Sequence, residues 1–170
     1  MVPRGAFTLT TSPTRAFMRA SPIGLFTLTG STSLVPLGGC GEIGRNMTVI
    51  ETNEDLVVVD CGLMFPDDEM FGVDIVINDF TYVRERAHKL RALLVTHGHE
   101  DHIGAIPYLL SRFDMPVWAP PHACALIRSR LAEVKETGAP PLASEPVLKE
   151  ATVRGLYRVG SFWVEPIRVT

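Results

Sequence analysis

Short apolar runs separated by polar turns dominate the hydrophobic pattern of the chain from residue 34 onward. Apolar runs of four residues or so, bounded by turn residues, are typical of buried strands. The run at residues 56–59 is apolar at every position, which indicates a strand buried on both faces. We predict strands at residues 34–37, 47–50, 56–59, 92–95, 116–119, 157–159 and 162–164.

Two later segments repeat their apolar residues every three or four positions, as one buried face of a helix does. The first comprises Ile103, Ile106, Leu109 and Leu110, and the second comprises Ala123, Leu126, Ile127, Leu131 and Val134. A shorter, polar helix is expected at residues 82–90. Because strands alternate with helices, the pattern predicts an α/β fold, or α+β in some classifications.

Composition divides the 170 residues into an extension and one domain. Residues 1–33 contain three arginines and no acid, so they are expected to be either a disordered extension or a leader of the organellar type. Residues 34–170 have the composition of one globular domain. The net charge of −3 gives no reason to expect a nucleic acid or an anionic membrane as partner.

The cysteines and the length of the apolar runs indicate where in the cell the protein is located. Cys40, Cys61 and Cys124 are odd in number and form no paired motif, which favours a reducing compartment. No run approaches the roughly 18 apolar residues that a membrane helix needs. We expect a cytoplasmic protein without a membrane partner, with organellar targeting by residues 1–33 as the alternative.

Candidate chemistry is concentrated in residues 96–102, directly after the apolar run at 92–95. His97 and His99 alternate with Gly98, so both imidazoles can point to one side of an extended segment. Asp101 and His102 follow where the chain turns into the next helix, and they could serve a second metal ion. Paired metal ions are a common device for hydrolysis, so the cluster predicts a two-metal hydrolytic site. His88 and His122 stand isolated and are expected to be ordinary side chains.

Several segments together resemble the ribonuclease J family, from the β-CASP group of the metallo-β-lactamase superfamily. Residues 96–102 match the superfamily pattern HxHxDH. The flanking matches are residues 34–46 (LVPLGGCGEIGRN), 60–66 (DCGLMFP), 72–74 (GVD) and 102–110 (HIGAIPYLL). The resemblance implies the N-terminal half of an αββα sandwich, with a mixed sheet and helices on one face.

The resemblance also implies a zinc-dependent ribonuclease that acts as a 5′-to-3′ exonuclease and sometimes as an endonuclease. His97 and His99 would hold one zinc ion, and Asp101 and His102 the other. Asp101 would also accept a proton from water, and Asp60 would orient the ligands. The implied partners are RNA, preferably with a 5′-monophosphate, and further copies of the full-length chain.

A second ion is implied with less support from the residues. Met70 and Gly72 correspond to loop positions whose backbone carbonyls bind calcium in some relatives. The acidic loop around Asp67 suits that ion, but a solvated loop without calcium explains the same residues. The glycine-rich run at residues 38–44 lacks the spacing of a phosphate-binding loop, so we predict a turn near the active site.

Ligand counting predicts an incomplete site. Catalytic zinc ions usually have three protein ligands, whereas this chain offers two for each ion. The resemblance places the remaining ligands after residue 170, so we expect a truncated ribonuclease J domain that is inactive by itself. Two alternatives stay open: another hydrolase of this fold, acting on a thioester or a lactam, and a non-catalytic chain that binds metal.

Overall fold

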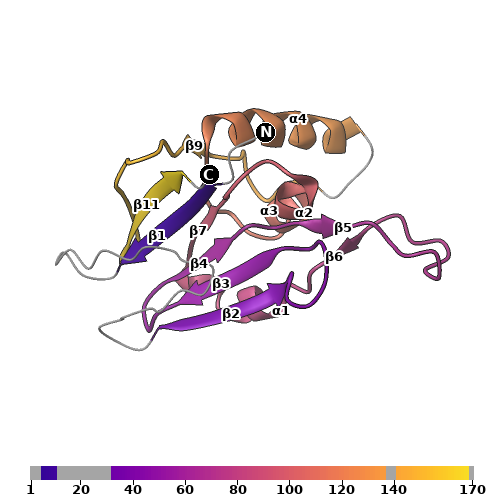
Figure 1. Cartoon of the computed structure of the whole chain (residues 1–170), viewed down its shortest axis with the longest axis horizontal. Coiled ribbons are helices and arrows are strands. Elements are labelled where there is room, and N and C mark those ends of the chain that lie inside the picture. Colours follow the sequence, from indigo (N-terminus) through magenta and orange to yellow (C-terminus); the bar gives the residue numbers. More distant parts are fainter. Residues whose placement is uncertain (1–4, 11–31, 137–140, 169–170) are drawn as a thin grey trace.

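A mixed six-stranded sheet organises the chain in the computed structural model, which describes residues 5–10, 32–136 and 141–168 (Figure 1). The strand order is β2-β3-β4-β7-β8-β9. Pairing is antiparallel from β2 to β4 and parallel from β4 to β9. The strands are β2 (Ser33–Gly38), β3 (Met47–Glu51), β4 (Leu56–Val59), β7 (Leu90–Leu94), β8 (Val117–Ala119) and β9 (Leu148–Glu150).

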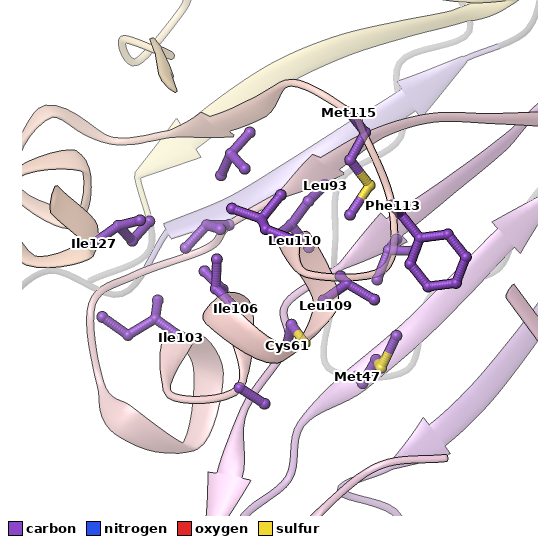
Figure 2. Close-up of a cluster of buried hydrophobic side chains, with 14 of the residues drawn as sticks. Met47, Cys61, Leu93, Ile103, Ile106, Leu109, Leu110, Phe113, Met115 and Ile127 are labelled. Atoms are coloured by element: carbon purple, nitrogen blue, oxygen red, sulfur yellow. The ribbon is translucent and has the colours of Figure 1, made fainter. Parts of the chain in front are cut away.

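The helices cover one face of this sheet. They are α1 (Thr81–Glu85), the 3-10 helix η1 (Ala87–Lys89), α2 (Glu100–Ile103), α3 (Ile106–Leu110) and α4 (Pro121–Glu136). Figure 2 shows the side chains of Ile106 and Leu109 lying between α3 and the sheet residues Leu93 and Met47. All four are buried. This apolar layer is the larger of two cores and fixes α2 and α3 on the sheet.

A second, three-stranded antiparallel sheet covers the opposite face, in the order β1-β11-β10. Its strands are β1 (Gly5–Thr10), β10 (Tyr157–Val159) and β11 (Phe162–Arg168). Val57, Ala92 and Leu94 of the main sheet pack there against Phe162 and Val164. The molecule therefore has three layers, helix, sheet and sheet, and the predicted mixed α/β sheet with helices on one face is confirmed.

Several details differ from the sequence-based expectation. The polar helix expected at residues 82–90 is split into α1 and η1, and Leu90 begins β7 instead. The loop after β4 contains a small hairpin of β5 (Leu63–Met64) and β6 (Val76–Ile77). Strand β9 was not predicted either, because only its first residue is apolar.

Strand β1 lies within the stretch that we assigned to an extension. Its six residues pair in antiparallel register with β11, from Gly5 opposite Arg168 to Thr10 opposite Trp163. The rest of that stretch, residues 1–4 and 11–31, lies outside the described residues, as do 137–140 and 169–170. Among the described residues, no helix is both long and apolar enough to cross a membrane.

Candidate metal centre

The candidate site lies where the parallel strands β4 and β7 end. Asp60 directly follows β4, and its backbone N–H donates to the carbonyl of Leu94 at the end of β7 (2.8 Å). Residues 96–99 continue from β7 toward α2. Since the carboxyl ends of parallel strands meet at one edge of a sheet, Asp60 and the histidine segment are brought together although 36 residues separate Asp60 from Thr96.

The buried carboxylate of Asp60 contacts both Thr96 and His102 of this segment. One carboxylate oxygen, Oδ1, accepts the backbone N–H of Thr96 (2.8 Å), and Oδ2 accepts the Thr96 hydroxyl (2.7 Å). Oδ2 also lies 2.8 Å from Nδ1 of His102, so the Nδ1 proton of a neutral His102 points at the carboxylate. The other ring nitrogen, Nε2, then carries no proton and presents its lone pair, as a metal ligand requires.

The backbone of Asp60 is in the left-handed region, with φ of 59°. For a residue other than glycine this conformation costs about 1–2 kcal/mol, and Asp and Asn tolerate it best. The hydrogen bonds of the carboxylate compensate for that cost. Asp60 therefore follows a core strand directly and lies beside Thr96 and His102, and its role in orienting the ligands remains a prediction.

His97 and His99 form the first pair of candidate ligands. Nε2 of His97 lies 3.1 Å from Nδ1 of His99, and their ring centroids are 4.6 Å apart. His97 is buried, and burial, followed by the nearby charge of His102, lowers its pKa. A histidine that stays neutral keeps a lone pair available for a metal ion.

Asp101 and His102 form the second pair. Oδ2 of Asp101 lies 3.4 Å from Nε2 of His102. The His102 ring packs against His97 with 4.0 Å between centroids, so the two pairs are neighbours. Two ligands of one tetrahedral zinc ion, each about 2.0–2.1 Å from it, stand about 3.3 Å apart. The spacing within each pair and the donor atoms therefore fit zinc.

The fit is limited to pairs. Among the described residues, no group of three or more His, Cys, Asp or Glu side chains could hold a metal ion. Ligation, and the expected two ligands for each ion, remain predictions.

Close backbone packing fixes helix α2, which carries Asp101 and His102. The N–H of Cys61 donates to the carbonyl of His102 (2.8 Å), and the N–H of Ala105 donates back to the carbonyl of Cys61 (3.0 Å). A Cβ added to Gly62 would stand only 1.6 Å from the Asp101 carbonyl oxygen, so only glycine fits there. Close packing against Asp101 thus explains why a glycine stands at position 62 of the segment 60–66.

Asn46 is a site residue to which the sequence analysis gave no role. Its side-chain nitrogen Nδ2 lies 3.0 Å from Oδ2 of Asp101 and 3.2 Å from Nε2 of His102. The only sequence signal was its place in the segment 34–46 that resembles ribonuclease J, two residues after the glycine-rich run at 38–44. The end of this segment reaches the site, because the backbone N–H of Asn46 donates to the Asp101 carbonyl (2.9 Å).

The calcium candidates lie in the exposed loop between β5 and β6, which protrudes from the body in Figure 1. The carbonyl of Met70 accepts the N–H of Val73 (3.2 Å), and Gly72 has a φ of 76°. The N–H of Met70 donates to the carbonyl of Asp67 (2.9 Å), and calcium binding remains a prediction. His88 and His122 are exposed, on η1 and α4, outside the cluster.

The chain is similar in sequence to ribonucleases J from several bacteria. Ribonuclease J of Synechocystis sp. is 42% identical over 146 residues, which are 85% of this chain and 22% of that protein. Ribonuclease J of Helicobacter pylori is 47% identical over 103 residues, 61% of this chain and 15% of that protein. Ribonuclease J2 of Bacillus subtilis is 45% identical over 105 residues, 62% of this chain and 19% of that protein. The chain thus spans about a fifth of the length of these relatives.

The family comparison covers most of the described domain. The profile of the Metallo-beta-lactamase superfamily matches residues 40–165, from the glycine-rich turn to strand β11. The matched region contains Asp60 and all four candidate ligands. On this match, the chain belongs to the metallo-beta-lactamase superfamily.

Proposed function

We propose that the chain provides the zinc-binding residues of a ribonuclease J-type active site, which hydrolyses RNA phosphodiesters. The observation that carries the proposal is the paired arrangement of four donor side chains at zinc spacing, at 3.1 Å and 3.4 Å. The similarity to ribonucleases J over 85% of this chain supports RNA as the substrate class.

In this proposal His97 and His99 hold one zinc ion, and Asp101 and His102 hold the other. When bound, the ions supply Lewis-acid stabilisation of the negative charge that develops on the phosphate. A pair of ligands leaves most of each coordination shell open, so we expect this chain alone to bind zinc weakly and to hydrolyse little RNA.

Two carboxylates have distinct roles in the proposal. Asp101 has a side chain that is 39% exposed, so its carboxylate can reach an attacking water and accept a proton from it. Asp60 is buried and cannot reach substrate. Its carboxylate accepts the hydrogen bond from Nδ1–H of His102 and so presents Nε2 to the ion. Asp60 thus acts through His102 rather than on RNA.

The remaining features follow from the resemblance to ribonuclease J. We propose 5′-to-3′ exonuclease action on RNA with a 5′-monophosphate, with endonuclease action as a second mode. We also propose assembly of the complete protein into homo-oligomers and calcium binding by the carbonyls of Met70 and Gly72.

A chimera tests the proposal. This chain replaces the corresponding segment of Synechocystis ribonuclease J, and the zinc-loaded chimera is incubated with 5′-monophosphorylated RNA. We expect release of mononucleotides and a loss of at least about 100-fold in the rate for His97→Ala, because transition-state charge loses its stabilisation. The matched control, His122→Ala, changes an exposed histidine of α4 and should keep the rate.

A chimera that folds and binds zinc but leaves RNA intact, while the parent enzyme degrades it, would contradict the proposal. Hydrolysis of a thioester or a lactam by that chimera would point to a different hydrolase. Mononucleotide release by the 170-residue chain itself would instead refute its expected inactivity.

A further inference from the structure

Asn46 makes an unusual set of contacts with the second ligand pair. Its Nδ2 atom lies 3.0 Å from Oδ2 of Asp101, 3.1 Å from the Asp101 carbonyl and 3.2 Å from Nε2 of His102. Its backbone carbonyl accepts the N–H of Gly62 (3.0 Å). Asn46 is therefore held by its backbone while its side chain faces both members of the pair.

The side-chain amide of Asn46 faces two hydrogen-bond acceptors. Because Nδ1–H of a neutral His102 donates to Asp60, Nε2 presents a lone pair, and it stands 3.4 Å from the carboxylate oxygen of Asp101. Two acceptors so close repel each other unless an electropositive group lies beside both. The N–H groups of Asn46 supply that group and hold the pair at the spacing of zinc ligands.

Packing around the other end of the amide supports this orientation. Gly39 has a φ of 80°, and a Cβ built there would stand 2.4 Å from Oδ1 of Asn46. The amide oxygen thus lies over the bare backbone of Gly39, and the nitrogen points toward Asp101 and His102. The glycine leaves room for the Asn46 side chain to reach the pair.

We propose that Asn46 is a positioning residue that presets Asp101 and His102 for their zinc ion. The zinc part of this inference rests on the proposed function, whereas the preset pair is a property of the metal-free chain. Outer partners that orient metal ligands typically change metal affinity by about 10–100-fold.

The test compares Asn46→Ala with Asn78→Ala. The side chain of Asn78 donates to the Arg45 carbonyl (2.8 Å), so its loss loosens the same turn without removing the Asn46 amide. By calorimetry, Asn46→Ala should weaken the Asp101–His102 zinc site at least about 10-fold and leave the His97–His99 site unchanged. Asn78→Ala should weaken either site by less than about 3-fold.

A second readout needs no zinc. In the metal-free chain, the ¹⁵N resonance of His102 Nε2 should move downfield in Asn46→Ala, toward the position of an imidazole nitrogen without a hydrogen bond. Where Asn46→Ala fails to fold, Asn46→Leu keeps a side chain of similar size, removes the same N–H donor without adding a charge, and should give the same direction of shift.

Unchanged His102 resonances in the folded variant would overturn the inference, as would equal zinc losses in Asn46→Ala and Asn78→Ala. The wild-type chain could bind no zinc while Asn46→Ala still shifts the His102 resonance as expected. That result would count against the proposed function and leave the positioning role of Asn46 standing.

Discussion

The four candidate ligands differ in how their side chains are held. His97 is buried with its Nδ1 atom 3.0 Å from the Thr96 hydroxyl, and His102 is fixed by Asp60. His99 is exposed, and its ring contacts the ring of His97. We infer that Asp60 matters most for the geometry of the second pair, because it contacts the His102 ring at Nδ1, on the side opposite to Nε2.

Asp60→Asn tests this inference at a single residue. Asparagine tolerates the left-handed backbone of position 60, so the fold should be kept. The neutral amide oxygen accepts a weaker hydrogen bond from Nδ1–H of His102 than the carboxylate does. The zinc affinity of the Asp101–His102 pair should therefore fall by about 10–100-fold. Calorimetric titration measures this, and an unchanged affinity in the folded variant would remove the orienting role.

Residue-scale prediction from the sequence had a clear limit. The spacing of His97, His99, Asp101 and His102 located the cluster because those residues are neighbours along the chain. Asn46 was missed because its contact with Asp101 spans 55 positions, and nothing local marks such a partner. Only the resemblance drew attention to its segment, without assigning it a task.

At the element scale, a buried carboxylate joins the two sheets. Asp55, in the turn between β3 and β4, is only 7% exposed and pairs with Arg91 of β7. It also accepts the N–H of Ser161 (2.6 Å), which lies in the turn between β10 and β11. Burial by itself would raise the pKa of Asp55, but the hydrogen bonds from Arg91 and Ser161 outweigh it and hold the pKa below its ordinary value.

Asp55→Asn should therefore destabilise the chain in a pH-dependent way. A lowered folded-state pKa stabilises the fold above the unfolded value of about 3.9, and the contribution is lost as pH falls through the folded pKa. We expect a loss of about 1–3 kcal/mol in the free energy of unfolding at pH 7 that shrinks toward pH 3. Urea unfolding at several pH values measures it, with exposed Asp67→Asn as control. A loss that does not change with pH would contradict this account.

The helical layer depends on the apolar face that the sequence indicated. Leu109 is fully buried between α3 and the sheet (Figure 2). Leu109→Ala should lower the free energy of unfolding by about 2–5 kcal/mol, because it leaves a cavity. Chemical unfolding measures the loss, and Leu126→Ala, at a 38% exposed position of α4, is the milder control. Equal losses in the two variants would show that α3 is not packed as described.

The same apolar face shows why element boundaries were harder to predict than elements. The spacing over residues 103–110 predicted one continuous helix, but the chain forms α2 and α3. Pro107 has no N–H to donate to residue 103, and the N–H of Ala105 bonds to Cys61 instead. A distant backbone partner therefore competes with the local helix, and periodicity does not reveal such a partner.

At the scale of the whole molecule, the hydrophobic pattern of the sequence predicted the layers better than it predicted which strands pair. The uniformly apolar run at residues 56–59 predicted a strand buried on both faces, and β4 indeed lies between the helices and the second sheet. The pairing of β1 with β11 joins residues near opposite ends of the chain. No local pattern specifies such a partner, so this strand was not expected.

The central claim is that the four side chains bind zinc as two pairs, and zinc stoichiometry tests it most directly. Native mass spectrometry with calorimetric titration should find two zinc ions on the wild-type chain. It should find one after His97→Ala with His99→Ala, and one after Asp101→Ala with His102→Ala. A single ion that disappears in both double variants, or no bound zinc in the folded wild-type chain, would contradict the account.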